Sequence, residues 1–446
     1  LSLRQMSEAH QIDPQMPPFP DDRDMTAPQP VPMEPYEAPE AGDGQIIRPV
    51  PRVTIQAFCE TPDVGVSLQR AAQDRRLAKA HLTVHMGGIA AAVSHYVDTP
   101  TPGLIIVESQ LGGSQILGSL DRLAEVCDAG TRIVVVGHAN DITLYRELIR
   151  KGVNDYLVAP LNPLQIVESI STLYSDPEAP PLGRTIAFVG ARGGAGSSTM
   201  AHNAGWCISE HMNEDVTVVD LDLAFGTGGL DFNQDPAQGV ADALYAPERL
   251  DDVLLERLLV RCTEHLSLFA APATLDRDYA IDEETYELVL DVVRHTVPCV
   301  ILDLPHVWGP WTRKLLLEAD EIVVTATPDL ASLRNTKNLL DTLKTARPND
   351  VSPHLVINQV GIAKRPEIPV KDFADALEID PALVLPFDAA LFGEAANNGQ
   401  MIEEIDARSK TAQGMRHLAS VVSGRQISAS SKPSGSLLAR LLGKKG

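Results

Sequence analysis

A glycine-rich segment, Gly190-Ala-Arg-Gly-Gly-Ala-Gly-Ser-Ser-Thr199, has the residue types of a phosphate-binding loop. It follows a strand-like apolar run, 185–189, and precedes a predicted helix that begins near Ser198. Closely spaced glycines let backbone N–H groups converge on an anion, and the helix N-terminus adds partial positive charge. A purely structural turn is the alternative; the G-x-G-x-x-G spacing of a dinucleotide loop is absent. The segment therefore predicts a site for nucleotide phosphates.

This loop resembles the deviant Walker A motif of the ParA/MinD superfamily of ATPases, K-G-G-x-G-K-[ST]-[ST]. Two positions depart from it: Arg192 stands at the signature lysine, and Ser197 replaces the lysine that reaches the β- and γ-phosphates. The resemblance implies ATP and Mg²⁺ as cofactors, with the Ser198 hydroxyl as a metal ligand. The implied nucleotide-binding residues of the loop are Gly190, Gly193, Gly194, Ala195, Gly196, Ser197, Ser198 and Thr199.

Two segments that contain aspartates follow the loop in the same order as the corresponding motifs of the superfamily. Residues 218–226 resemble switch I, which implies that Asp222 positions the attacking water and that Asp220 lies near the metal. Residues 299–305 resemble the Walker B strand, which implies that Asp303 binds magnesium through water. An aspartate that ends a buried strand is also often a simple cap, so the order of the segments carries the assignment.

Two further segments resemble the adenine-binding elements of the superfamily. Residues 356–359 end a predicted strand and place Asn358 where the family reads adenine. Residues 386–388 resemble the second adenine-side element, with Pro386 and Asp388 as the implied contacts.

The loss of the lysine bears directly on catalysis. A cation at the transferring phosphate stabilises developing charge, and serine supplies none. Backbone amides, the helix terminus and magnesium remain, so we expect ATP binding that promotes dimerisation, with slow or absent hydrolysis. Arg192 either reaches the partner's nucleotide, as the family's lysine does, or serves its own loop. Asp222 and Arg192 are the candidate catalytic residues, and whether the chain is an enzyme stays open.

The elements that must hold these residues follow an α/β pattern. Strands are predicted at 185–189, 216–220, 266–270, 300–303, 321–326 and 354–357, with helical segments between them. Such alternation predicts a doubly wound parallel sheet, here a MinD-like P-loop domain over 184–422.

A second α/β pattern precedes it and predicts a flavodoxin-like domain over 52–175, because five βα units fit in this length. The predicted strands are 53–58, 82–85, 104–107, 133–136 and 155–158; the predicted helices are 64–75, 89–96, 115–127, 142–151 and 163–174.

This N-terminal pattern resembles the receiver domain of response regulators, without its phosphorylation site. Cys59 and Glu60 stand where a receiver has its acidic pair, and Glu108 stands where it has the phosphoacceptor aspartate. Gly137 replaces the receiver's Ser or Thr at the end of the fourth strand, and Ala159 replaces the lysine that precedes the proline. Because phosphoryl transfer needs these groups together, we predict a pseudo-receiver that serves in docking or dimerisation. A generic α/β domain unrelated to receivers is the alternative.

Composition limits the remaining function classes. A net charge of −23 disfavours broad nucleic-acid binding. Five scattered cysteines exclude a C-x-x-C site and favour a reducing, cytoplasmic setting. No apolar run approaches the roughly 20 residues of a membrane span. Residues 1–51, rich in proline and acidic side chains, are predicted to be disordered, and 176–183 a linker.

The combination of a receiver-like domain and a degenerate MinD-like domain resembles the CpaE/TadZ family of Tad/Flp (type IVc) pilus assembly proteins. The resemblance implies a homodimeric scaffold at the cell pole, peripheral to the inner membrane, that recruits the pilus secretion ATPase and the inner-membrane platform. A ParA-type partition ATPase is the alternative, although it would need a basic DNA-binding face.

The basic tail, 423–446, ends in a Leu/Lys/Arg pattern at helical spacing. It predicts either a short amphipathic helix on an anionic membrane or a frayed soluble tail.

Overall fold

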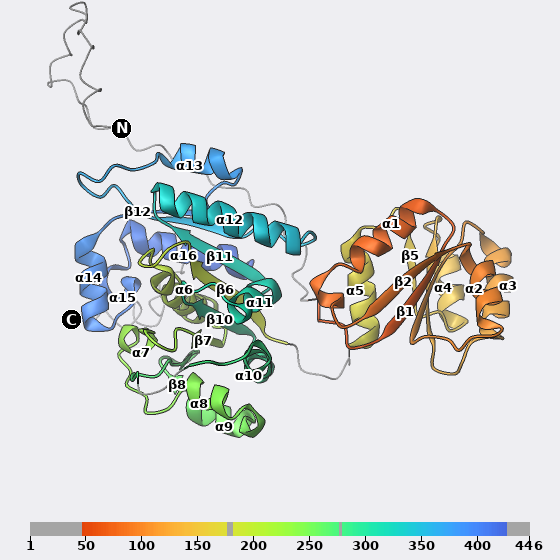
Figure 1. Ribbon diagram of the computed structural model, residues 1–446, viewed down its shortest axis with the longest axis horizontal. Helices are drawn as coiled ribbons and strands as arrows, with labels where there is room; N and C mark the ends of the chain where they lie inside the picture. The colour runs from red at the N-terminus through yellow and green to blue at the C-terminus, as the bar shows by residue number, and fades with distance from the viewer. Residues whose placement is uncertain (1–46, 176–181, 276–278, 426–446) are drawn as a thin grey trace, which may run out of the picture. The chain divides into compact units, whose positions relative to one another are not determined.

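The computed structural model describes residues 47–175, 182–275 and 279–425 (Figure 1). The predictions for residues 1–46 and for the tail from 426 onward lie outside these residues. Two parallel-stranded sheets lie in the ranges where the sequence predicts two α/β domains. The domain boundaries themselves stay predictions. Within the described residues, no helix is both long and apolar enough to cross a membrane.

The N-terminal sheet is parallel throughout, with the strand order β2-β1-β3-β4-β5. This is the flavodoxin-like order, which confirms the predicted layout. Its strands are β1 (Thr54–Cys59), β2 (His81–Met86), β3 (Leu104–Glu108), β4 (Arg132–Gly137) and β5 (Asp155–Val158). Its helices are α1 (Pro62–Ala71), α2 (Gly88–Tyr96), α3 (Gly113–Ala124), α4 (Ile142–Arg150) and α5 (Pro163–Tyr174).

Helices cover both faces of this sheet (Figure 1). Buried side chains of α1 and α5 pack on one face, and those of α2, α3 and α4 pack on the other. The predicted helix 64–75 is too long: α1 ends at Ala71, and a 3₁₀ turn, η1 (Arg75–Leu77), follows. Asp74 explains the break, because its carboxylate accepts a hydrogen bond from Arg76 N and starts the new turn.

The C-terminal sheet has eight strands in the order β13-β12-β11-β6-β10-β7-β9-β8, parallel except for the β8–β9 pair. Its strands are β6 (Arg184–Gly190), β7 (Val216–Asp220), β8 (Val260–Arg261), β9 (Leu266–Phe269), β10 (Cys299–Leu304), β11 (Glu321–Ala326), β12 (His354–Val360) and β13 (Leu383–Pro386). The central strands β6, β7 and β10 are almost fully buried, which explains their continuous apolar runs.

Two layers of helices sandwich this sheet (Figure 1). One face carries α8 (Val240–Tyr245), α9 (Asp252–Leu258), α10 (Glu283–Thr296), α11 (Pro310–Glu318), α12 (Leu330–Ala346) and α13 (Val370–Leu377). The other carries α6 (Ser197–Met212) and α16 (Lys410–Ser423). Shorter elements are α7 (Gly228–Asp231), η2 (Pro247–Arg249), α14 (Ala389–Asn398) and α15 (Ile402–Asp406).

Two edge strands, β8 and β13, were not among the predicted strands. β8 has two residues, and β13 has four, the last of them a proline. Segments this short carry too little periodicity to be distinguished from loops, and proline is tolerated in a sheet mainly at an edge.

The position of the receiver phosphoacceptor holds a buried carboxylate, Glu108, at the end of β3. Its Oε2 accepts hydrogen bonds from Glu60 N (2.7 Å) and Thr61 N (2.8 Å). Its Oε1 accepts one from Thr61 Oγ1 (2.6 Å) and lies 2.9 Å from His138 Nε2. Burial would raise the pKa of Glu108, but these hydrogen bonds outweigh it and lower that pKa. Glu108 is therefore held in its charged form as a structural group, which is consistent with the pseudo-receiver prediction.

Replacing Glu108 with glutamine should lower the free energy of unfolding by about 2 kcal/mol, because hydrogen bonds to a charged group are lost. Because the pKa of Glu108 is lower in the folded than in the unfolded protein, the charged carboxylate stabilises the fold at pH values above its unfolded pKa, near 4.5. This stabilisation is lost as the pH falls through the folded pKa. The difference between wild type and Glu108→Gln should therefore shrink in acid. Urea unfolding at pH 7 and pH 3.5, followed by circular dichroism, measures it.

Glu60→Gln is the matched control, because this exposed carboxylate accepts a single hydrogen bond, from Gln110 N (2.9 Å). Its effect should stay within about 0.5 kcal/mol. Transfer of phosphate from acetyl phosphate to the wild-type domain would contradict the pseudo-receiver prediction.

Candidate nucleotide site

The glycine-rich loop joins the carboxyl end of β6 to the first turn of α6, as predicted. Gly194 and Gly196 have φ of +77° and +92°, a backbone region that favours glycine. At Gly196 a Cβ would also lie 2.6 Å from Asn358 Nδ2, so a side chain is excluded by contact as well. Ser198 and Thr199 lie half-buried in the first turn of α6.

Neighbouring strands and helices hold the loop through its carbonyl oxygens. Asn358 Nδ2 donates to Ala195 O, and Gln359 Nε2 donates to Gly194 O, both at 2.9 Å. Asn335 Nδ2 donates to Ala191 O at 2.9 Å, and His306 Nδ1 lies 2.8 Å from Gly190 O. Because these side chains bind the carbonyls, they fix the loop's shape without occupying its N–H groups, which an anion needs.

Asp220 ends β7, and Asp303 is the next-to-last residue of the neighbouring strand β10; the two are opposite each other in the register. Both are buried, with 0% and 2% exposure. Asp220 accepts hydrogen bonds from Gly228 N (2.9 Å) and Asp222 N (3.1 Å). Burial, followed by the neighbouring Asp303 carboxylate, raises the pKa of Asp220 to about 7.

His202, on the second turn of α6, supplies the positive charge beside this acidic pair. It is fully buried; its Nδ1 lies 2.7 Å from Asp231 Oδ2, and its Nε2 lies 3.3 Å from Asp303 Oδ2. Burial alone would lower the pKa of His202, but the two carboxylates outweigh it and raise that pKa to about 10. An imidazolium therefore bridges the Walker B aspartate to α7.

Arg192 forms an ion pair within its own chain in this structure. Its guanidinium lies 3.1 Å from Asp329 Oδ2, and its side chain is half-exposed. Asp329 also accepts hydrogen bonds from Thr327 Oγ1 (2.6 Å) and Ser332 N (2.9 Å), so it caps α12. The two roles predicted for Arg192, toward a partner's nucleotide or toward its own loop, both stay predictions; in this conformation its guanidinium is paired with Asp329.

Three buried polar atoms at the site have no hydrogen-bond partner: Ser197 Oγ, Asp303 Oδ1 and His202 Nε2, although the last lies within ion-pair distance of Asp303 Oδ2. Unpaired buried polar atoms are costly and are expected to meet a ligand or ion. The unpaired Asp303 Oδ1 belongs to a carboxylate beside a second buried carboxylate, that of Asp220. Carboxylate oxygens are the ligands that Mg²⁺ prefers. The residues present therefore fit a nucleotide with a divalent cation.

The other predicted residues occupy less central positions. Asp222 lies in the loop after β7, where its Oδ1 accepts a hydrogen bond from Phe225 N at 3.0 Å. Pro386 ends β13, and Asp388 caps α14 by accepting a hydrogen bond from Leu391 N at 3.0 Å. Asn358 contacts the phosphate loop itself, while the roles of all these residues toward adenine and water stay predictions.

Sequence reasoning missed His202, Asp231, Asp329, Asn335 and Gln359. His202 lies one helical turn beyond Ser198 and therefore on the same face of the helix, but that spacing does not reveal its carboxylate partners. The partners from α7 and α12 lie far away in the sequence, and no motif marks them.

Replacing His202 with glutamine should destabilise the C-terminal domain by about 3–5 kcal/mol near pH 6, because buried carboxylates lose their cation. Because the pKa of His202 is higher in the folded protein, about 10, than in the unfolded protein, about 6.5, its protonated ring stabilises the fold fully below pH 6.5. This stabilisation is lost as the pH rises to about 10. The difference between wild type and variant should therefore shrink between pH 6.5 and 10. Tryptophan fluorescence during urea unfolding reports it, because all three tryptophans (206, 308 and 311) lie in this domain.

His265→Gln is the control, since His265 forms a surface ion pair with Asp215 at 2.8 Å. It should change the unfolding free energy by less than about 1 kcal/mol. A pH-independent difference for His202→Gln would show that His202 is not a buried cation.

Comparison with known proteins places this geometry in a family. The AAA domain family matches residues 183–357. The septum site-determining protein MinD of Synechocystis is 22% identical over 55% of this chain and 91% of its own length. The chromosome-partitioning ATPase Soj of Treponema pallidum is 29% identical over 36% of this chain and 64% of its own length.

Two solved structures of pilus assembly proteins are more similar in sequence. CpaE from Caulobacter crescentus is 48% identical; the match covers 29% of this chain and 100% of that one, with a TM-score of 0.29. CpaE2 from Sinorhizobium meliloti is 40% identical over 26% of this chain and 97% of that one, with a TM-score of 0.26. Because the chain spans the whole of a CpaE structure at 48% identity, it belongs to the CpaE family within the ParA/MinD superfamily.

Proposed function

We propose that this chain is an ATP-binding scaffold of a Tad (type IVc) pilus system that hydrolyses ATP weakly or not at all. One observation carries the proposal: the phosphate cradle is intact, yet the buried residue at the position of the P-loop lysine is Ser197, whose hydroxyl has no partner. Serine brings no charge to a transferring phosphoryl group. The site therefore favours binding over turnover.

The residues of the loop have distinct roles in this proposal. The N–H groups of 193–199 and the N-terminus of α6 bind the phosphates. Magnesium, when bound, supplies positive charge between the phosphates, and Ser198, Asp220 and Asp303 are the residues placed to hold it. Asp222 orients water, and Asn358, with Pro386 and Asp388, faces the nucleoside side. A MinD structure from Pyrococcus horikoshii contains Mg-ADP, which is consistent with this choice of cofactors.

Dimerisation is supported by exposed apolar side chains around the loop. Phe225, Trp308 and Leu330 are 74%, 58% and 73% exposed. They follow β7, β10 and β11. These parallel strands lie beside β6 or one strand away from it, so the three side chains leave the sheet at the same edge as the phosphate loop. Exposed apolar groups gathered around a functional site are typical of an interaction surface. A second copy of this chain is the occupant that we propose.

The pilus role is supported by the CpaE relatives, whose names describe pilus assembly proteins. As an ATP-bound dimer at the cell pole, the chain would recruit the secretion ATPase and the inner-membrane platform. Its pseudo-receiver domain would supply a docking surface, and its basic tail a contact with the membrane surface.

In single-turnover assays, wild-type protein should bind ATP and release phosphate slowly. Ser197→Lys should raise the hydrolysis rate by about 10-fold or more, because it restores the cation that stabilises the transition state. Quench-flow measurement of phosphate release from labelled ATP checks both rates.

Asp222→Ala in the Ser197→Lys background is the control, and it should remove the gained activity. Wild-type turnover as fast as that of an ordinary partition ATPase, abolished by Asp222→Ala, would refute weak hydrolysis. Failure to bind ATP at millimolar concentration would refute the nucleotide switch.

In a strain that lacks the gene, wild-type protein should restore surface pili, and the Phe225→Ser/Leu330→Ser variant should not. The double change removes apolar area from the proposed dimer face, so the ATP-dependent dimer should weaken by about 10-fold or more. Pilus display by electron microscopy and dimerisation by sedimentation velocity check the two effects together.

Val351→Ser is the matched control, because Val351 is 76% exposed and precedes β12 at the opposite edge of the sheet. It should dimerise and restore pili normally. Normal pili in the deletion strain, together with ATP-dependent binding of duplex DNA at moderate salt, would favour the partition ATPase alternative.

A further inference from the structure

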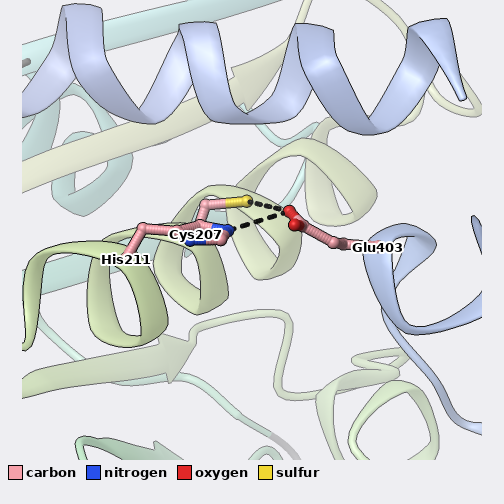
Figure 2. Close-up of side chains that lie close together, drawn as sticks. All are labelled: Cys207, His211 and Glu403. Carbon is pink, nitrogen blue, oxygen red and sulfur yellow. Dashed lines mark hydrogen bonds and ion pairs between the residues drawn. The ribbon is translucent and has the colours of Figure 1, made fainter. Parts of the chain in front are cut away.

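Three metal-binding side chains converge at the far end of α6 from the phosphate loop. Cys207 and His211 lie one helical turn apart on α6, and Glu403 reaches them from α15 (Figure 2). Cys207 Sγ lies 3.8 Å from Glu403 Oε2, and His211 Nε2 lies 3.0 Å from the same oxygen. Cys207 is buried, while His211 and Glu403 are partly exposed, so solvent can deliver an ion.

The spacing of these donors fits a tetrahedral ion. Their three ligand atoms all lie within 4.8 Å of one another. Around zinc, with bonds of about 2.0–2.3 Å, neighbouring ligand atoms are separated by about 3.3–3.6 Å. The two separations from Glu403 Oε2, 3.0 and 3.8 Å, bracket this range, and the Cys207 and His211 ligand atoms lie within 4.8 Å of each other.

Arg416 orients the carboxylate for this purpose. Its Nη1 donates to Glu403 Oε1 at 2.6 Å, and its Nη2 donates to Ala407 O at 3.2 Å. One oxygen of Glu403 is thereby occupied, and the other is left pointing at the thiol and the imidazole. Metal-binding carboxylates commonly have such an outer partner that fixes their orientation.

We propose that Cys207, His211 and Glu403 form a zinc-type divalent metal site. Thiolate, imidazole and carboxylate are all ligands of zinc, and three of them leave a fourth position for water. On binding, the Cys207 thiol releases its proton to solvent, so thiolate and carboxylate balance the two charges of the ion. Neither the P-loop motif nor the CpaE resemblance led to this site.

The site would tie α15 to the helix that follows the phosphate loop. Ile402, next to Glu403, donates its backbone N–H to Asn203 Oδ1 on α6 at 2.9 Å. Asn203, Met401 and Ile402 also line a cavity of about 300 Å³ that reaches Thr199. A bound ion would therefore stiffen the wall between this cavity and α6.

Full-length protein without an affinity tag, stripped with a chelator, should bind one Zn²⁺ per chain in competition with a chromophoric chelator. Co²⁺ in its place should give an intense near-ultraviolet thiolate-to-metal charge-transfer band. Cys207→Ala should abolish that band and weaken zinc binding by more than about 100-fold, since outer-shell changes alone cost about 10- to 100-fold. Zinc should also raise the thermal midpoint of wild type but not of Cys207→Ala.

Cys262→Ala is the matched control, because this partly buried cysteine lies outside the cluster; it should keep the band and the affinity. Glu403→Gln, which nearly preserves shape, should also weaken zinc binding and keeps the test informative if Cys207→Ala misfolds. Wild-type protein that binds no zinc, or a cobalt band that persists in Cys207→Ala, would overturn the proposal.

Discussion

The buried pair of aspartates at the ends of β7 and β10 is the constraint on which the nucleotide site depends. Two carboxylates at 0% and 2% exposure cannot both stay charged without a cation close by. His202 supplies it, and because His202 belongs to α6, the same interaction fixes that helix against the sheet. The phosphate loop is the connection between β6 and α6, so its position follows from this charge balance.

The same charge balance supports the proposal that the site favours binding over turnover. Arg192 and His202, the cationic groups described beside the loop, are already bound to Asp329, Asp231 and Asp303. Ser197 adds no charge to the loop. Charge that develops during phosphoryl transfer would have to be met by magnesium or by a second copy of the chain.

The architecture was predictable from the sequence because buried parallel strands leave continuous apolar runs, such as Cys299–Leu304. The glycine loop was predictable from its residue types and its place between a strand and a helix, and the two aspartates were implied by the resemblance to the superfamily's switch I and Walker B segments. His202 was not, since a single histidine on a helix reports nothing about the carboxylates that will surround it. The hydrogen bonds from Asn335 and Gln359 to the carbonyl oxygens of the loop join segments more than 140 residues apart in the sequence. No local sequence pattern marks such contacts.

Helix α6 connects features that the sequence presents separately. Its first turn closes the phosphate cradle, its second carries His202 against Asp303, and its last two carry Cys207 and His211 against Glu403. A helix transmits displacement along its axis as a nearly rigid rod, since its backbone hydrogen bonds are internal. Any ligand that moves the cradle must therefore strain the buried ion pair, the α15 contact, or both. Nucleotide binding at one end and the proposed metal site at the other would therefore be coupled through this single helix.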